Sequence, residues 1–327
     1  MKVSQPPQES ATIAAIDLGA TRIKAGLVVD GVIRTSTTTV LGPDDKTQDG
    51  IVLRLDAVFH DLCARGNVDP SAIAAIGIGA AGATRHVEGI IAHSPNFPAW
   101  SEFPLRRLLV ERLGLPVHLD NDANALTLGE ARFGAGRGYR DFVCLTLGSG
   151  VGGGLFLNGQ VYRGAFGMAG ELGHITVVPE GFPCNCGNRG CLEQYASATG
   201  LRNRVRRDDL FGGLTDTALA DPDLPRRLFE AARAGDERCR GYFDDFGYHL
   251  AIGIGTILQV LNVRLVILAG GLARALPAFG PRLMAELPGR GYPCVNSVAD
   301  VVPCALWEDG GVLGAAALVD EAQAGKS

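Results

Sequence analysis

Hydrophobic and polar residues alternate in two similar stretches of the chain, and each stretch predicts a β-hairpin with a glycine loop. Residues 13–33, IAAIDLGATRIKAGLVVDGVI, predict a strand, a loop of small residues, a second strand and an Asp-Gly turn. Residues 142–162, FVCLTLGSGVGGGLFLNGQVY, repeat this order and end in an Asn-Gly turn. An internal repeat of this kind predicts two lobes that are built on one plan.

The segments around the repeats alternate between helical and strand patterns. Apolar residues at helical spacing predict a helix within residues 52–62, and a continuous apolar run predicts a strand within residues 72–82. Residues 113–134 predict a strand, a sharp turn and a helix, whereas residues 263–276 predict a strand, a Gly-Gly pair and the start of a helix. Residues 309–320 predict a small-residue helix suited to close packing between lobes. We therefore expect an α/β protein.

Length and composition exclude several classes of protein. With 327 residues, 46% of them hydrophobic, the chain can bury the core of one large domain or two ordinary ones. The 30 basic and 35 acidic residues form no long runs, which argues against a nucleic-acid or membrane partner. The first ten residues lack the apolar core of a signal peptide, and no apolar stretch approaches the roughly 20 residues that span a bilayer. We expect a cytoplasmic protein with a small-molecule partner.

Cysteine spacing points to a metal. Three of the eight cysteines, Cys184, Cys186 and Cys191, lie close together in the segment HITVVPEGFPCNCGNRGCLE, residues 174–193. This clustering favours a metal site over disulfide bridges. By itself it leaves open whether a metal would be catalytic or structural, or whether these are buried or redox cysteines that merely lie close together. We expect the other five to be buried thiols. They are Cys63, Cys144, Cys239, Cys294 and Cys304.

Two common nucleotide motifs do not apply. Gly148, Gly150 and Gly153 have the spacing GxGxxG, but the loop leads into a second strand rather than a helix, which argues against a dinucleotide site. No GxxxxGK[ST] motif occurs, so the chain is not a P-loop protein.

Eight blocks in order along nearly the whole chain resemble the ROK sugar kinases, which belong to the superfamily of actin and hexokinase. The blocks are DLGATRIKAGLV, GIGAAG, IIAHSPNFPAW, LPVHLDNDANALTLGE, TLGSGVGGGLFLNGQVYRG, AGELGHI, CNCGNRGCLEQYAS and ILAGGLA. The resemblance implies a two-lobed, ribonuclease H-like fold, in which each lobe has a mixed β-sheet flanked by helices. We expect an N-terminal lobe of residues 1–120, joined by a C-terminal helix at about 308–327, and a C-terminal lobe of residues 121–307.

The resemblance also implies that the metal is a structural Zn2+ in a loop at residues 174–193. His174, arriving from the preceding strand, would join Cys184, Cys186 and Cys191 in a tetrahedral shell. Four protein ligands leave no open position for water, which disfavours a zinc hydrolase. In ROK kinases the residues that match Glu171, His174 and Glu193 contact sugar hydroxyls.

Asp122 is the general base that the resemblance implies for the catalytic step. It would accept the proton of the attacking sugar hydroxyl, while Asn121 helps to orient the ring. Helix capping is the alternative role for an aspartate at a strand-to-helix junction. Gly82 and Asn96 match further sugar contacts of the family.

The two glycine loops are implied to bind the phosphates of ATP from two sides. Asp17 would hold Mg2+ through water, and a glycine pair would lie beside adenosine. The residues concerned are Gly19, Ala20, Thr21 and Arg22 in the first loop, Thr146, Gly148, Ser149 and Gly150 in the second, and Gly270 and Gly271 in the pair.

The sequence departs from the family pattern at three places. Ala20 stands where a second glycine is typical, Ala81 where a proline usually precedes Gly82, and Thr84-Arg85 where Val-Asp is frequent. Ala20 would constrain the first loop if that loop needs a positive φ angle.

The resemblance implies a kinase that transfers the ATP γ-phosphate to the 6-hydroxyl of a hexose, with glucose as the first choice. Kinases of N-acetylmannosamine, N-acetylglucosamine, mannose or fructose share nearly every motif, and the donor, ATP or polyphosphate, is open. A non-catalytic sugar sensor is the second alternative. A ROK repressor is disfavoured, because about 16 residues ahead of Asp17 are too few for a DNA-binding domain. Family members are commonly homodimers or homotetramers, and we expect either.

Overall fold

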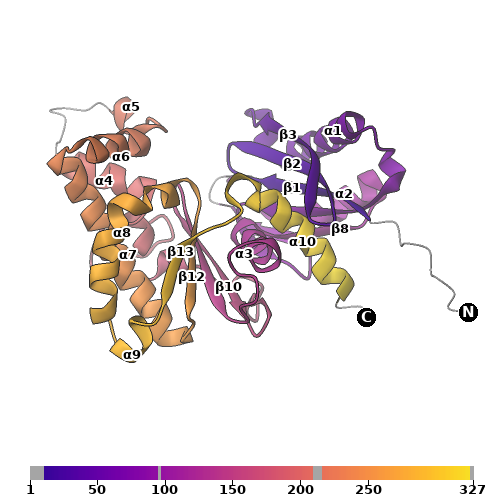
Figure 1. The fold of residues 1–327 in the computed structure, drawn as a ribbon. Coiled ribbons are helices and arrows are strands. Elements are labelled where there is room, and N and C mark those ends of the chain that lie inside the picture. The colour runs from indigo at the N-terminus through magenta and orange to yellow at the C-terminus, as the bar shows by residue number, and fades with distance from the viewer. Residues whose placement is uncertain (1–10, 95–96, 209–215, 325–327) are drawn as a thin grey trace, which may run out of the picture. The chain divides into compact units, whose positions relative to one another are not determined.

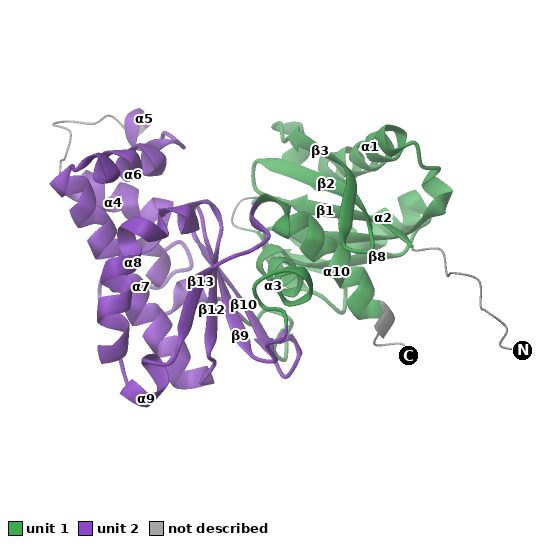
Figure 2. Cartoon of the chain, in the orientation of Figure 1, with its two compact units in different colours: residues 1–137, 163–169, 308–327 green, residues 138–162, 170–307 purple. Residues whose placement is uncertain are grey.

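Two compact units make up the chain in the computed structural model, which describes residues 11–94, 97–208 and 216–324. Unit 1 consists of residues 1–137, 163–169 and 308–327, and unit 2 of residues 138–162 and 170–307 (Figure 2). Helix α3 (Asp122–Phe133) belongs to unit 1, where it packs against the C-terminal helix α10 (Gly310–Ala324). We expected the N-terminal lobe to end at residue 120, before α3. By contacts, the first segment of unit 1 ends at residue 137, after α3.

A five-stranded mixed sheet forms the centre of unit 1. Its first strand, β1, pairs antiparallel with β2 on one side and parallel with β4 on the other. In spatial order the strands are β3 (Val32–Val40), β2 (Arg22–Val29), β1 (Thr12–Leu18), β4 (Ile73–Ala80) and β8 (Val117–Asn121). A separate antiparallel sheet consists of β5 (Ala83–Arg85), β6 (Ile90–His93) and β7 (Ser101–Phe103).

Alternation along β4 explains how helices cover both faces of this sheet. Ile76 and Ile78 lie in a hydrophobic core with side chains of α1 (Gln48–Gly66) and α2 (Leu105–Leu113). Gly77 and Gly79 face the other way: a Cβ on Gly77 would collide with the backbone of α10, and one on Gly79 would lie 2.9 Å from a side chain of α3. The glycines therefore let α3 and α10 approach the sheet closely (Figure 1).

Unit 2 repeats the topology of unit 1. Its sheet has the order β11 (Gln160–Val161), β10 (Val151–Leu157), β9 (Phe142–Leu147), β12 (Leu265–Ala269) and β13 (Asp300–Pro303). As in unit 1, the hairpin partner of the first strand is antiparallel and the later strands are parallel. Both hairpin turns have positive φ at both central residues, as an Asp-Gly or Asn-Gly turn of type I′ requires. The duplicated plan and the two-lobed α/β fold are thus confirmed.

Helices of unit 2 pack together on one face of its sheet. Val143, Leu145 and Leu147 of β9 share a core with apolar side chains of the long helix α7 (Glu237–Leu261). The other helices are α4 (Ala198–Arg207), α5 (Asp216–Leu219), α6 (Leu224–Ala234), α8 (Leu276–Glu286) and α9 (Pro293–Asn296). Short 3-10 turns include η3 (Leu172–His174), η4 (Leu192–Gln194) and η5 (Gly271–Ala275).

Two further expectations concern the cysteines and the membrane. Cys63, Cys144, Cys239 and Cys304 are buried as expected, but Cys294 is exposed, because it lies on the one-turn helix α9 rather than in the core. Among the described helices, none combines the length and the apolar character that a bilayer-spanning segment needs.

Candidate functional site

Asn121 and Asp122 lie at the junction of β8 and α3, in unit 1. The Oδ1 atom of Asn121 accepts hydrogen bonds from the backbone N–H groups of Ala123 (2.9 Å) and Asn124 (3.2 Å), so Asn121 is the N-cap. Its Nδ2 atom donates to the carbonyl oxygen of Gly82 at 3.0 Å, which uses one of its two N–H bonds. Asp122 is the first helical residue, and its Oδ1 accepts from Ala123 N–H at 2.9 Å. The capping role is thus filled by the neighbour of Asp122.

Gly82 lies where the chain turns after β4. Its φ of +135° is one that residues with a side chain rarely adopt, and a Cβ there would lie 2.7 Å from the carbonyl oxygen of His93. The N–H of Ala81 donates to Leu18 O at 3.0 Å, a bond that a proline could not make, so alanine suits this position. Asn96 lies outside the described residues.

The first glycine loop connects β1 and β2 by a tight turn. The N–H of Gly19 donates to the carbonyl oxygen of Arg22 at 3.1 Å, while Ala20 has no positive φ angle. Alanine therefore causes no backbone strain in this loop, contrary to the concern raised by the family pattern. Thr21 and Arg22 are exposed.

Asp17 lies on the face of β1 that meets α10. A Cβ on Gly311, in the first turn of α10, would collide with the Asp17 carboxylate. Burial raises the pKa of Asp17 above its ordinary 3.8, although the charge of Lys24, its pairing partner on the adjacent strand β2, opposes the rise. A half-buried carboxylate of this kind is a group that a bound cation would hold in the charged form.

The second glycine loop lies against Glu193 of the cysteine-rich segment. A Cβ on Gly150 would collide with the Glu193 carboxylate, and Glu193 Oε2 accepts from the N–H of Val151 at 3.1 Å. On the other side, the carbonyl oxygens of Gly148 and Ser149 accept hydrogen bonds from the first turn of α4. The loop is thus fixed between α4 and Glu193.

The four predicted metal ligands lie together. The ligand atoms of His174, Cys184, Cys186 and Cys191 are all within 4.8 Å of one another. The sulfur atoms of Cys186 and Cys191 are 3.6 Å apart, and His174 Nδ1 is 3.5 Å from Cys184 Sγ. Two thiolates bound at about 2.3 Å in a tetrahedral zinc shell lie about 3.8 Å apart, so these side chains fit Zn2+.

The chemistry of the cysteines agrees with a cation site. Burial, together with the adjacent thiols, raises the pKa of Cys191 to about 12. Such a thiol keeps its proton at neutral pH unless a metal replaces that proton. His174 lies in the 3-10 turn η3 and not on a strand, which corrects our expectation, because the chain turns at Gly170 instead of pairing with the sheet.

His174 presents its two nitrogens to different partners. While Nδ1 faces Cys184, Nε2 lies 3.9 Å from Oε2 of Glu171, whose side chain is exposed. A histidine that binds a metal through Nδ1 keeps an N–H at Nε2 for a second contact. His174 can therefore serve both the metal and a polar ligand next to Glu171.

Gly270 and Gly271 follow β12. Gly270 has a φ of +83°, and a Cβ there would lie 2.5 Å from the carbonyl oxygen of Leu147, so this glycine is needed for the fold itself. A Cβ on Gly271 would meet no atom within 4 Å. Of the two, Gly271 is the position beside open space, where a ligand can approach the backbone.

Comparison with known proteins now identifies the family. The sequence profile described as "ROK family" matches residues 13–322. The chain belongs to the ROK family. It is 37% identical to the glucokinase of Thermotoga maritima over 315 residues, which cover 94% of this chain and 97% of that protein.

Two solved ROK structures are similar over almost their whole length. The ROK family glucokinase from Streptomyces griseus, in complex with glucose and AMPPNP, has a TM-score of 0.80 and 33% identity and covers 94% of this chain and 99% of its own. The ROK hexokinase from Thermus thermophilus has a TM-score of 0.78 and 30% identity and covers 96% of this chain and 99% of its own.

In this ROK chain the predicted site residues fall into two groups, one in each unit. Those in unit 1 are Asp17, Gly19, Ala20, Thr21, Arg22, Gly82, Asn121 and Asp122. Those in unit 2 are Thr146, Gly148, Ser149, Gly150, Glu171, His174, Cys184, Cys186, Cys191, Glu193, Gly270 and Gly271. Direct contacts link Gly82 with Asn121, and Gly150 with Glu193.

Sequence reasoning missed Asp120, the fully buried carboxylate beside Asn121 and Asp122. Its Oδ1 accepts from the N–H of Asn121 (2.7 Å) and from Nδ2 of Asn124 (3.1 Å), and its Oδ2 accepts from Arg163 Nε at 2.7 Å. Asp120 therefore stabilises the strand-to-helix junction through hydrogen bonds to Asn121 and Asn124. The sequence did offer a sign of this role, because Asp120 lies in an apolar strand, where a buried aspartate is rarely found without a charged partner.

Proposed function

We propose that this ROK chain is a glucokinase that transfers the γ-phosphate of ATP to the 6-hydroxyl of glucose. The observation that carries the proposal is the similarity to glucokinases over nearly the full length of both chains. The aspartate at the strand-to-helix junction, the two glutamates near the cysteine-rich segment and the two glycine loops support the proposal, because such a kinase needs a base, hydroxyl-binding groups and phosphate-binding loops.

Asp122 is the proposed general base, which accepts the proton of the 6-hydroxyl as it attacks the phosphorus. Its place at the first residue of α3 supports this role, because Asn121 already caps the helix and Asp120 holds the backbone of the junction. Asn121 would orient the sugar with the second N–H of its amide, which the Gly82 carbonyl does not use. Most of the acceleration in phosphoryl transfer comes from such alignment and from charge neutralisation.

Glu171 and Glu193 are proposed to accept hydrogen bonds from glucose hydroxyls, and His174 to donate one from Nε2. A site that pairs each hydroxyl rejects analogues that lack one, since an unpaired buried group is left behind. Asn96 and Gly82 are proposed as further sugar contacts. The zinc ion would be structural, because all four ligand positions come from the protein.

The loops 19–22 and 146–150 are proposed to bind the ATP phosphates, with Gly271 and Gly270 beside adenosine. Asp17 would hold Mg2+, which neutralises phosphate charge when it is bound. A homodimer or homotetramer and a cytoplasmic location stay predictions, and light scattering on the purified chain tests the first.

A coupled ADP-release assay tests the function. Purified protein with Mg-ATP is given glucose, mannose, fructose, N-acetylglucosamine or N-acetylmannosamine, beside the Asp122→Ala variant. Turnover that is highest with glucose, and about 10³-fold lower in the variant, is expected. Turnover restricted to an N-acetylhexosamine would replace glucose as the substrate, and no sugar-dependent turnover would favour a non-catalytic sensor.

A further inference from the structure

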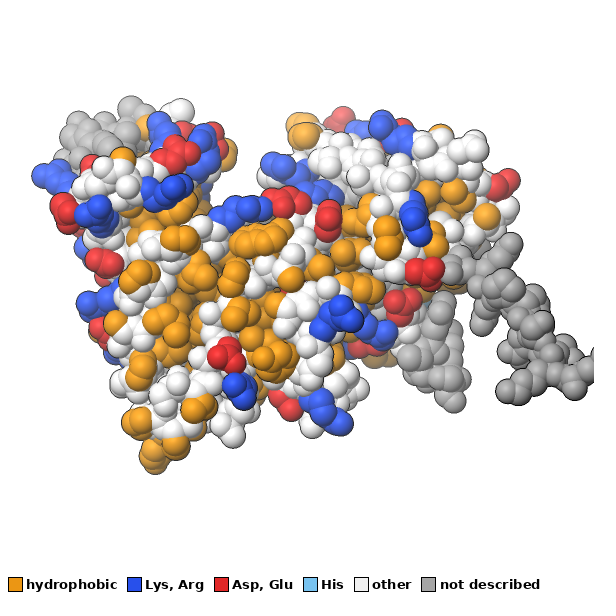
Figure 3. Space-filling model, in the orientation of Figure 1, with side chains coloured by type: hydrophobic (Ala, Val, Ile, Leu, Met, Phe, Trp, Pro, Cys, Tyr) orange, Lys and Arg blue, Asp and Glu red, His pale blue; other side chains and the backbone are white. Residues whose placement is uncertain are grey.

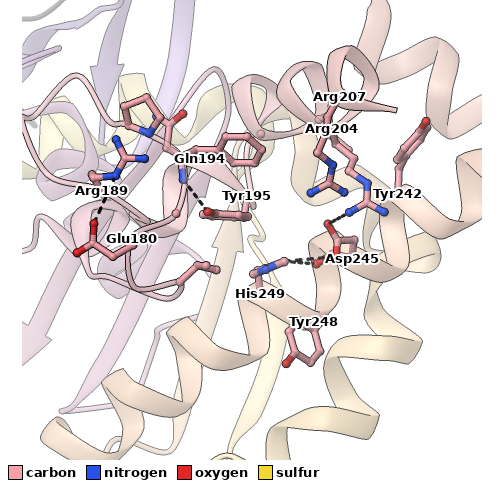
Figure 4. Close-up of a pocket in the computed structure, with 16 residues that line it drawn as sticks. Glu180, Arg189, Gln194, Tyr195, Arg204, Arg207, Tyr242, Asp245, Tyr248 and His249 are labelled. Atoms are coloured by element: carbon pink, nitrogen blue, oxygen red, sulfur yellow. Dashed lines mark hydrogen bonds and ion pairs between the residues drawn. The ribbon is translucent and has the colours of Figure 1, made fainter. Parts of the chain in front are cut away.

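A cavity of about 630 Å³ lies in unit 2, beside the cysteine-rich segment 174–193. Its walls come from that segment, from the end of η4 and the residue after it, from α4 and from the middle of α7 (Figure 4). None of the residues assigned above to the hexose, ATP or the metal lines it. The volume is in the range of pockets that bind small metabolites.

Aromatic rings form one side of this cavity. Tyr195 and His249 are stacked, with ring centroids 4.5 Å apart and an interplanar angle of 25°, and Phe182 tilts against Tyr195 at 5.4 Å. Burial lowers the pKa of His249, which favours a neutral imidazole at this wall. Tyr242 and Tyr248 of α7 add two further rings. Such walls suit the apolar face of a sugar or a base.

Cationic groups form the other side. Figure 4 shows Arg204 and Arg207 reaching from α4 toward the cavity. Arg204 pairs with Asp245 (3.1 Å) and Asp208 (2.9 Å), and Arg207 pairs with Asp208 (3.0 Å). These ion pairs hold both guanidinium groups in place. Charged side chains gather over the end of unit 2 that holds α4 and α6 (Figure 3).

Arg189 adds a third cation to the lining. Its Nε lies 3.8 Å from the exposed carboxylate of Glu180, at the loose end of the ion-pair range. The lining thus carries three arginines and two carboxylates, Glu180 and Asp245, while Asp208, which pairs with Arg204 and Arg207, lies outside it. Guanidinium groups fixed by neighbouring carboxylates are well suited to bind phosphate oxygens with paired N–H donors.

We propose that this cavity binds a phosphate monoester with a ring-bearing body, such as a hexose phosphate or a nucleoside monophosphate. The phosphate contacts Arg204 and Arg207, and the ring lies against Tyr195 and His249. The choice of a hexose phosphate as a probe rests on the proposed kinase reaction, whose product belongs to that class. The site itself rests on the cavity and its lining alone.

The cavity shares a wall with the segment that holds the metal ligands. The N–H of Phe182 donates to the hydroxyl of Tyr195 at 2.9 Å, and Phe182 lies two residues before Cys184. Tyr195 in turn follows Glu193 by two residues. A ligand against Tyr195 therefore contacts the same short segment that carries Glu193.

Isothermal titration calorimetry on the full-length protein tests the proposal. The protein is first saturated with glucose and AMPPNP, so that a ligand cannot bind where these two bind. Glucose 6-phosphate, AMP, inorganic phosphate and further glucose are then titrated separately. We expect at least one of the two monoesters to bind with one site per chain, and more tightly than inorganic phosphate.

Arginine variants locate the binding. Arg207→Gln and Arg204→Gln are each expected to raise the Kd of that monoester at least tenfold, whereas Arg227→Gln, an exposed arginine of α6 outside the lining, leaves it unchanged. Arg207→Gln keeps the test decisive if Arg204→Gln fails to fold. The proposal is overturned if neither monoester binds, if inorganic phosphate binds equally well, or if Arg207→Gln binds like Arg227→Gln. Because binding is read directly, a loss of kinase activity would not be mistaken for this result.

Discussion

Arg163 donates from Nε to Oδ2 of Asp120 over 2.7 Å, and the Asp120 side chain is fully shielded from solvent. Arg163 also pairs with Glu321 of α10, through Nη2 and Oε2 at 2.5 Å. Burial opposes the charge of Arg163, but the two carboxylates outweigh it and raise the pKa of its guanidinium. One side chain thus ties β8, the segment 163–169 and the C-terminal helix together within unit 1.

Removing this arginine should destabilise unit 1 strongly. Arg163→Leu leaves Asp120 buried without its cation, which typically costs about 3–5 kcal/mol of unfolding free energy. The matched control is Arg107→Leu, whose exposed partner Glu111 lies one turn away on α2, and there the expected cost is below about 1 kcal/mol. Urea unfolding of both variants measures the difference. If both variants lost the same unfolding free energy, the buried Arg163–Asp120 pair would contribute no more to stability than the exposed pair.

Gly150→Ala should damage the proposed hexose site while sparing the metal ligands. The added methyl group would displace the Glu193 carboxylate, and a misplacement of about 1 Å in a substrate-orienting group can cost about 10²-fold in kcat/KM. Zinc content per chain should stay as in the parent protein. Gly241→Ala on α7, where a Cβ meets nothing within 4 Å, is the control and should keep kcat/KM. An unchanged kcat/KM in Gly150→Ala would refute the role proposed for Glu193.

Loss of one thiolate should release the metal. Cys186→Ser is expected to lower zinc content well below the roughly one ion per chain of the parent and to lower Tm, because a structural zinc site contributes folding free energy. Cys294→Ser, at an exposed position, is the control and should keep the zinc content and the Tm of the parent. Metal analysis by mass spectrometry and a thermal melt give the two readings. A parent chain without zinc would disprove the site.

Asp17 should carry a pH-dependent cost to stability in the absence of Mg-ATP. Its folded pKa lies above the ordinary 3.8, so between these two values the folded state binds more protons than the unfolded state. Stability therefore falls as pH rises through that window, and at neutral pH the penalty is fully present. Asp17→Asn removes the penalty, so Tm at pH 7 should rise, by about 2–4 °C for each kcal/mol relieved.

The same substitution should abolish kinase turnover, since an amide does not supply the charge proposed to hold Mg2+. Asp244→Asn, at an exposed position of α7, is the control and should alter neither Tm nor turnover. A fall in Tm of Asp17→Asn at pH 7 would mean that the ionised carboxylate stabilises the fold instead.

Local pattern was sufficient for the elements that carry the site. The two hairpins follow from period-two alternation with Asp-Gly and Asn-Gly turns, and the junction at Asn121 and Asp122 follows from an apolar strand that meets a helical pattern. The spacing of the three cysteines favoured a metal, the family resemblance added His174, and all four lie within 18 residues of one another. In each case the backbone geometry of one short segment sets which residues lie together.

Contacts between distant segments were beyond such reasoning. Arg163 reaches Asp120 across 43 positions and Glu321 across 158, and Glu193 meets Val151 across 42. The cavity beside the cysteine-rich segment 174–193 likewise combines residues from the segment itself, α4 and α7. Periodicity reports which face of an element is apolar, but a pair of this kind depends on which elements become neighbours and in what register. The packing of the whole chain decides which elements become neighbours. A buried charge such as Asp120 is stable only when a residue distant in sequence pairs with it.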